Sequence, residues 1–191
     1  MERKNISKVL LAQFLILSIN IINSNWEEVY EILDLITTNL ENLGDHLDEN
    51  MKKINNDYSE KFQVDYRQIL ISRGYLLHWS LFLLKENKTG IEKYLHLIFN
   101  EKNLTILDNS FRSLIKYAIV LVLITKSRKN ISILKQTFFN SNSNISSFTA
   151  DLDKSNECYY NLFDSLFLNF NIDNVMVFLS ECKKVYNNVN K

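Results

Sequence analysis

The chain contains no proline, and only 3 of its 191 residues are glycine. Tight turns between β-strands depend on these two residue types, because glycine reaches positive φ and proline fixes the bend. A β-rich fold of this length would lack turn residues, so the composition predicts an all-α fold. Asparagine and serine serve as the loop residues instead, in segments such as NNDYSE and FFNSNSNISSF.

Apolar residues recur at helical spacing through most of the chain. The pattern predicts about eight helices, at 5–22, 26–43, 64–86, 89–99, 109–126, 128–139, 156–169 and 172–187. Polar residues interrupt it twice, which predicts loops at 48–61 and 140–155. Because helices of the same character resume after each loop, we interpret 1–191 as a single domain.

Two distant segments, NWEEVYEIL at 25–33 and NIDNVMVFL at 171–179, share one pattern. Each begins with asparagine and a bulky apolar residue, with an acid third, valine fifth and leucine ninth. This predicts a helix hairpin with asparagine in a tight turn, the acid in the first turn of the next helix, and valine and leucine facing the previous helix. Asp173 is an alternative N-cap. Two copies suggest stacked hairpins, which form an α-solenoid.

Bulk charge indicates no particular partner, because 22 Lys and Arg residues balance 22 Asp and Glu residues. The only two cysteines, Cys158 and Cys182, are too few for a disulfide framework. They indicate reduced thiols in a reducing compartment. We therefore expect a cytoplasmic protein that binds no membrane.

The N-terminus has a basic start and an apolar run, as signal peptides do. Polar residues interrupt the run, and no small-x-small cleavage site follows it. Several Asn-x-Ser/Thr sequons occur, which an asparagine-rich chain produces by chance. The apolar run at 117–125 is shorter than the roughly 20 residues that span a bilayer. A secreted or membrane-associated helical protein is thus a weaker alternative.

Catalytic and metal-binding motifs are absent from the sequence. The histidines His46, His78 and His96 form no H-E-x-x-H, the cysteines form no C-x-x-C, and there is no G-x-S-x-G or glycine-rich phosphate loop. We expect no catalytic residue, no metal and no cofactor. An enzyme with an unrecognised site is the remaining alternative, and it would need a polar cavity around His78 or a cysteine close to a histidine.

The segment YLLHWSLFLL at 75–84 is among the most apolar in the chain, yet it contains a histidine. On a helix over 64–86, one line of side chains runs through Ile71, Tyr75, His78 and Phe82. Because the helix is apolar nearly all round from 75 onward, we expect it to be buried on most sides. His78 is then predicted to be a neutral core residue that donates its N–H to a carbonyl or hydroxyl.

The region 112–135 has a local excess of cations, in contrast to the acidic helix expected at 26–43. These cations are candidate contacts for a partner or for RNA: Arg112, Lys116, Lys126, Arg128, Lys129 and Lys135. A solvated face is the commoner interpretation. The functional one is that TKSRKN forms a basic turn that contacts RNA or an acidic partner subunit. No interleaved aromatic residues support sequence-specific reading of RNA.

Three stretches, LLHWSLFLL at 76–84, NWEEVYEIL at 25–33 and LFLNFNIDNVMVFLSEC at 166–182, resemble the family of subunit e of eukaryotic translation initiation factor 3. Their order matches that family, and the basic segment at 109–135 lies between the second and third of them in the expected place. The residues that carry the pattern are Asn25, Trp26, His78, Trp79, Ser80, Leu81, Phe82, Asn169, Phe170, Asp173 and Cys182.

The resemblance implies a PCI-type α-solenoid of stacked TPR- or HEAT-like helical repeats, without the winged helix that follows them in the family. It implies a non-enzymatic scaffold whose partners are other subunits of initiation factor 3, the small ribosomal subunit and, through the basic turn, mRNA or rRNA. The nearest alternative is a PCI scaffold of the proteasome lid or the COP9 signalosome.

Overall fold

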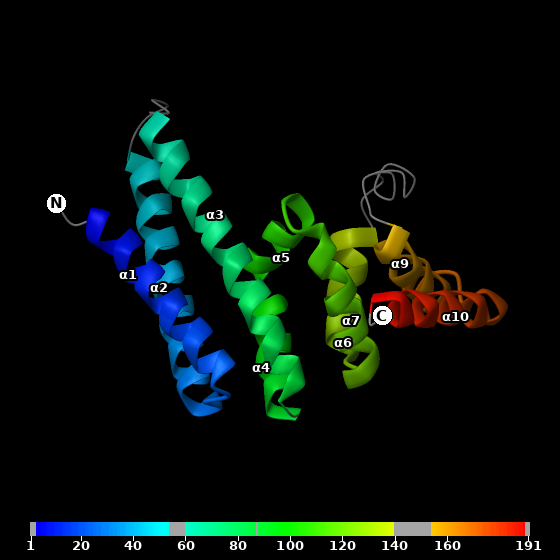
Figure 1. The fold of residues 1–191 in the computed structure, drawn as a ribbon. Coiled ribbons are helices and arrows are strands. Elements are labelled where there is room, and N and C mark those ends of the chain that lie inside the picture. Colours follow the sequence, from blue (N-terminus) through cyan, green and yellow to red (C-terminus); the bar gives the residue numbers. More distant parts are fainter. Residues whose placement is uncertain (1–2, 54–59, 87, 140–153, 190–191) are drawn as a thin grey trace. The chain divides into compact units, whose positions relative to one another are not determined.

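The computed structural model describes residues 3–53, 60–86, 88–139 and 154–189, and every element in these ranges is helical (Figure 1). The prediction of an all-α fold with about eight helices is confirmed, because the described ranges contain nine α-helices and three short 3-10 or π-helical turns. The chain divides into two compact units, Met1–Ile98 and Phe99–Lys191, and each is described by itself. The expected single domain over 1–191 stays a prediction, as does the solenoid arrangement.

Unit 1 consists of four α-helices and one 3-10 turn: α1 (Arg3–Ile22), α2 (Trp26–Lys53), α3 (Glu60–Ser80), η1 (Leu81–Lys85) and α4 (Lys88–Ile98). Each helix packs against the next one along the chain. Helix α2 is amphipathic and supplies the centre of the core with Val29, Leu33, Ile36 and Leu40, all fully buried at spacings of three and four. Leucines from α3 and η1 complete it.

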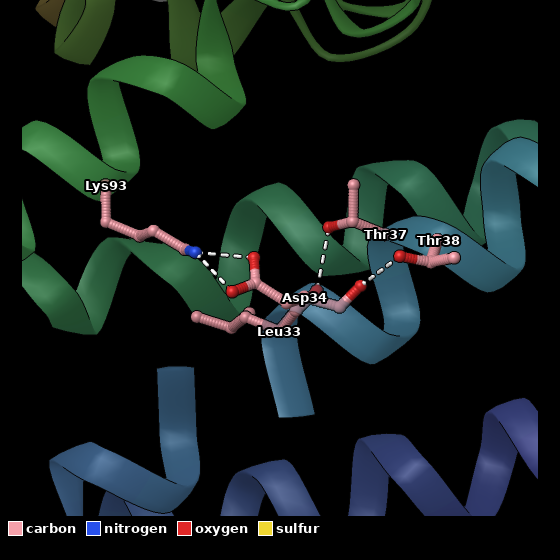
Figure 2. Close-up of polar contacts among 5 residues, drawn as sticks. All are labelled: Leu33, Asp34, Thr37, Thr38 and Lys93. Atoms are coloured by element: carbon pink, nitrogen blue, oxygen red, sulfur yellow. Dashed lines mark hydrogen bonds and ion pairs between the residues drawn. The ribbon is translucent and has the colours of Figure 1, made fainter. Parts of the chain in front are cut away.

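Helix α4 contacts its neighbours at a small residue, Gly90, and at a surface ion pair. A Cβ atom at Gly90 would lie 2.2 Å from the Leu83 carbonyl oxygen, so only glycine allows α4 this approach to η1. On the surface, Lys93 Nζ lies 2.5 and 2.6 Å from the two carboxylate oxygens of Asp34 on α2 (Figure 2). Beside this ion pair, the hydroxyl groups of Thr37 and Thr38 donate hydrogen bonds to the main-chain carbonyls of Leu33 and Asp34. An exposed pair like this contributes little stability.

Unit 2 consists of five α-helices, one 3-10 turn and one π-helical turn: α5 (Glu101–Asn109), η2 (Arg112–Leu114), α6 (Ile115–Thr125), α7 (Arg128–Leu134), η3 (Lys135–Phe139), α9 (Lys154–Phe167) and α10 (Ile172–Val189). Helix α6 is the apolar run noted in the sequence, and it packs against α7 and α9. The rings of Phe139 and Phe163 stack with centroids 4.8 Å apart, which joins η3 to α9. Helix α9 in turn packs against α10.

Several predicted boundaries were wrong. Helix α2 continues through Lys53 and α3 begins at Glu60, so most of the expected loop at 48–61 is helical. Residues 54–59, and 140–153 of the second expected loop, lie outside the described residues. Helix α5 was not predicted, although Asn100 caps it by accepting a hydrogen bond from the Lys102 amide at 3.1 Å.

The two asparagine turns predicted from the shared pattern are confirmed. The carbonyl groups of Asn25 and Asn171 accept the first helical bonds of α2 and α10, from the amides of Val29 and Val175. Both valines are buried. Asp173 lies within the first turn of α10, and Asn171 is the N-cap in its place, with its side chain bonded to the Asn174 amide.

The two hairpins differ at the last position of the pattern. Leu33 is fully buried, as expected, whereas Leu179 is 46% exposed. The prediction that Leu179 faces the previous helix was therefore wrong. Helix α2 has α1 and α3 as neighbours, whereas α10 packs mainly against α9, and among the described residues the side of α10 that carries Leu179 stays exposed.

Candidate interaction surfaces

His78 is exposed, and the prediction that it lies in the core was wrong. The rest of its predicted line is exposed with it: Ile71, Tyr75 and Phe82 are 41%, 58% and 38% accessible. The opposite side of the same segment is buried, with Leu76, Leu77, Ser80 and Leu83 all at 0%. We call these four residues, Ile71, Tyr75, His78 and Phe82, the α3 stripe.

The α3 stripe is exposed because the main neighbours of α3 within the described part of unit 1, α2 and α4, pack against its other side. Helices α2 and α4 cover the leucines, and α1 reaches only the edge of the stripe, where Phe14 meets Tyr75 edge-on with ring centroids 6.5 Å apart. Sequence periodicity shows that a helix is apolar all round, but it does not show how many helices surround it. His78 is thus not a core residue.

The other residues of the HWSLF run have structural roles. Ser80 is fully buried and donates a hydrogen bond to the Leu76 carbonyl at 2.6 Å, which satisfies its hydroxyl within the core. Trp79 and Leu81 are half-buried, and the Trp79 and Phe82 rings lie 5.8 Å apart. Lys85 Nζ lies 5.2 Å from the centre of the Phe82 ring, in a cation–π contact.

Helix α1 has a second uncovered apolar face, which the sequence analysis missed. Leu10, Leu17 and Ile21 are buried on one side of the helix. The other side is exposed by 49% to 77% at six apolar residues: Val9, Leu11, Leu15, Ile16, Ile19 and Ile22. The signal was the apolar run itself, which is far broader than one packing face requires. Solvated helix faces are normally polar, so this side of α1 has the composition of a contact surface.

The third apolar surface lies on α10 and on the turn before it. Phe170 is 74% exposed, and Ile172, Met176 and Leu179 follow it along one face of α10 at 78%, 67% and 46%. We call these four residues the hairpin patch. Phe170 also has φ of 51°, a left-handed conformation that is unfavourable for a bulky side chain and usual for glycine. An exposed aromatic side chain in a strained turn contributes little to packing.

The remaining pattern residues stabilise the hairpin turns. Asn25 donates from its side chain to that of Asn20 at 3.2 Å, and Asn169 donates to the Asp164 carboxylate at 2.5 Å. Trp26 is the half-buried first residue of α2. Cys182 is buried between α9 and α10, in a cluster that also contains Cys158.

The basic turn forms as predicted, between α6 and α7. Lys126 ends α6 in a left-handed conformation, with φ of 53°, and Ser127 caps α7 by accepting a hydrogen bond from the Asn130 amide at 3.4 Å. Lys126, Arg128 and Lys129 are all exposed. Cations in the first turn of a helix oppose its dipole. The two basic residues that begin α7 therefore do not stabilise that helix.

The other predicted contact cations take part in packing. Lys135 is half-buried and donates from Nζ to the Phe167 carbonyl at 3.0 Å, at the end of α9, where a cation is favourable. Lys116 lies over the Tyr117 ring at 5.4 Å. Arg112 is half-buried within η2. The exposed basic surface is thus the turn Lys126–Lys129, and the wider segment 112–135 does not form one surface.

Comparison with known proteins does not assign the chain to a family. A scan against protein-family models finds no match, and no curated protein matches the sequence significantly. Within the described ranges, no three metal-ligating side chains lie together. Among the helices described, none is both long and apolar enough to cross a membrane.

Proposed function

We propose that this chain is a non-enzymatic helical scaffold that binds other proteins through its uncovered helix faces. The observation that supports this best is Phe170, an aromatic side chain that is 74% exposed in a left-handed conformation. Strained residues of this kind persist where function requires them. Exposed aromatic side chains next to other apolar residues are typical centres of protein interfaces.

The more specific proposal is a cytoplasmic subunit related to subunit e of translation initiation factor 3. Its support is the resemblance of three sequence stretches in the family's order, together with helix hairpins at two of them. Partners would be the other subunits of that factor and the small ribosomal subunit. A PCI scaffold of the proteasome lid or the signalosome is the alternative.

The basic turn supports a second contact, with an acidic surface or with RNA. Its three exposed cations, Lys126, Arg128 and Lys129, lie together on one turn and do not stabilise the helix they begin. Contacts to phosphate weaken steeply with salt, since each displaces bound counterions. The hairpin patch and the basic turn are thus distinguishable by their salt dependence.

The test is an affinity purification of the tagged chain from cell extract, with identification of the captured proteins by mass spectrometry. We expect subunits of initiation factor 3 to be recovered with the parent chain and lost with Phe170→Gly, which removes the aromatic side chain and relieves the strained turn. Asn174→Ser, an exposed polar change on α10 shortly after Phe170, is the control and should retain them.

Each outcome has a defined consequence. Recovery of proteasome-lid or signalosome subunits would replace the initiation-factor proposal with its alternative. Equal recovery by the parent and by Phe170→Gly would remove the hairpin patch as the contact. Capture of no defined complex by the parent would contradict the scaffold proposal. Loss of ribosomal proteins alone, on adding salt or with Arg128→Glu, would assign them to the basic turn.

A further inference from the structure

The two cysteines, far apart in sequence, meet across the α9–α10 hairpin. Cys158 lies nine residues before Phe167, the last residue of α9, and Cys182 lies ten residues after Ile172, the first of α10. Helices that fold back at a short turn place residues at equal distance from that turn side by side. The register of the hairpin alone therefore brings the two cysteines to the same level.

Packing places the two thiols in direct contact. Cys158 and Cys182 belong to one buried cluster with Leu162 and Val175, and the two thiol groups are hydrogen-bonded to each other. Both are reduced in the structure. A disulfide requires the sulfurs at about 2 Å with facing Cβ atoms, and thiols already in contact across two packed helices need only a short approach.

The thiols are buried but close to the surface. Cys158 and Cys182 are 5% and 8% exposed, whereas Phe163 on the same helix is at 0%. On α10, the residues that flank Cys182 are exposed on both sides. An oxidant the size of hydrogen peroxide can reach this site through a small opening of the hairpin, whereas a bulky thiol reagent needs the helices to separate.

We propose that Cys158 and Cys182 form a reversible disulfide across the α9–α10 hairpin on exposure to a peroxide. The Cys158 thiolate attacks one peroxide oxygen, so that an S–O bond forms and the O–O bond breaks with release of water. The Cys182 sulfur then attacks the sulfenic sulfur, so that the S–S bond forms and the S–O bond breaks with release of a second water. The two thiols are oxidised and the peroxide is reduced.

The order of attack follows from the chemistry of Cys182. Burial, and after it the hydrogen bond with Cys158, raises the pKa of Cys182 to about 12. Its thiolate is therefore scarce at neutral pH, and Cys182 suits the second, resolving step, in which the neighbouring sulfur is already activated. The disulfide would clamp the helix that carries the hairpin patch to α9, independently of which partner that patch binds.

The test treats the folded, reduced chain with a small excess of hydrogen peroxide. We expect the intact mass to fall by two hydrogens, the thiol titre to fall to zero, and peptide mapping to find Cys158 joined to Cys182. The closed loop should raise the melting temperature by roughly 5–10 °C, and a dithiol reductant should reverse the rise. Cys158→Ser and Cys182→Ser should show neither the mass loss nor the rise.

Three results would overturn the proposal. One is oxidation that stops at sulfinic acid on either cysteine, and another is a disulfide between two chains in place of one within a chain. The third is thiols that resist peroxide in the folded chain while reacting in the denatured chain. Because reduced and oxidised parent protein are compared directly, the test holds even if a cysteine variant folds poorly.

Discussion

Arg73 on α3 is buried to 3% exposure and donates a hydrogen bond from Nη2 to the Leu40 carbonyl on α2, at 3.2 Å. Burial lowers the pKa of the guanidinium, and the carboxylates of Glu41 and Asp45 oppose that shift. A fully buried cation is expensive unless it is paired. The α2–α3 pair thus holds a buried charge, and the Leu40 carbonyl and the two carboxylates of α2 offset part of its desolvation cost.

Replacement of Arg73 separates the contribution of its charge from that of its volume. Arg73→Ala should lower the free energy of unfolding by about 2–4 kcal/mol, because it leaves a cavity and removes the hydrogen bond to the Leu40 carbonyl. Arg73→Met keeps the buried stem and removes the desolvation cost, so it should stay within about 1 kcal/mol of the parent. Urea unfolding measures both. Equal losses in the two variants would mean that the guanidinium contacts dominate.

The exposure of His78 predicts that its removal is nearly neutral. His78→Ala should change the free energy of unfolding by no more than about 0.5 kcal/mol, because no core contact is lost. The neighbouring Leu77→Ala should cost about 2–5 kcal/mol, since Leu77 is fully buried. Thermal and urea melts of the two variants, read side by side, check this. A large loss of stability in His78→Ala would mean that the His78 side chain makes core contacts.

Gly90 tests the close approach of α4 to η1. Alanine favours helices over glycine, yet Gly90→Ala should destabilise unit 1 by about 1–3 kcal/mol. The reason is that its Cβ would lie 2.2 Å from the Leu83 carbonyl oxygen, which belongs to the main chain. Glu92→Ala, an exposed change on the same helix, should have little effect. If Gly90→Ala instead stabilised the protein, the main chain of η1 would have to move away from the added Cβ at little cost.

The strained turn at Phe170 predicts a mutation that stabilises the fold. Phe170→Gly should raise the free energy of unfolding by about 1 kcal/mol, because glycine adopts positive φ freely and the exposed ring has little packing to lose. Ile172→Gly, at an equally exposed but helical position, should lower it by about 0.5–1 kcal/mol. Urea unfolding compares the two. A loss in both variants would mean that the Phe170 ring contributes to packing.

Alkaline pH should weaken the α9–α10 hairpin. The pKa of Cys182 rises from 9.0 to about 12 in the folded chain, and burial also raises that of Tyr159 beside it. Between about pH 9 and about pH 12 the unfolded chain therefore loses protons that the folded chain keeps. The free energy of unfolding therefore keeps its full value below about pH 9. As pH rises from about 9 to about 12 it decreases, by at most about 1.4 kcal/mol per pH unit for each proton.

Urea unfolding of the parent and of Cys182→Ala at several pH values across that window measures this effect. The variant lacks the Cys182 thiol, so its stability should fall less steeply with pH. An identical slope in both proteins would show that another group, such as Tyr159, accounts for the dependence.

Local patterns predicted the helices and turns that depend on local interactions. The shared pattern placed Asn25 and Asn171 at the starts of their helices, because an N-cap is decided by a few residues in sequence. The basic turn at Lys126–Lys129 was found for the same reason. Helix α5 was missed because it is short and its apolar residues, Leu104, Ile106 and Leu107, are too few to show helical spacing.

Tertiary structure decided which side of each helix is covered. The sequence by itself determined that the end of α3 is apolar all round and that α1 contains a long apolar run, but the neighbouring helices left His78 exposed and Leu77 buried. The sequence contains both cysteines but does not indicate that they meet, because their contact depends on the register of the α9–α10 hairpin. Burial and contact are properties of neighbours that lie far apart in the chain, whereas periodicity and capping are properties of residues a few positions apart.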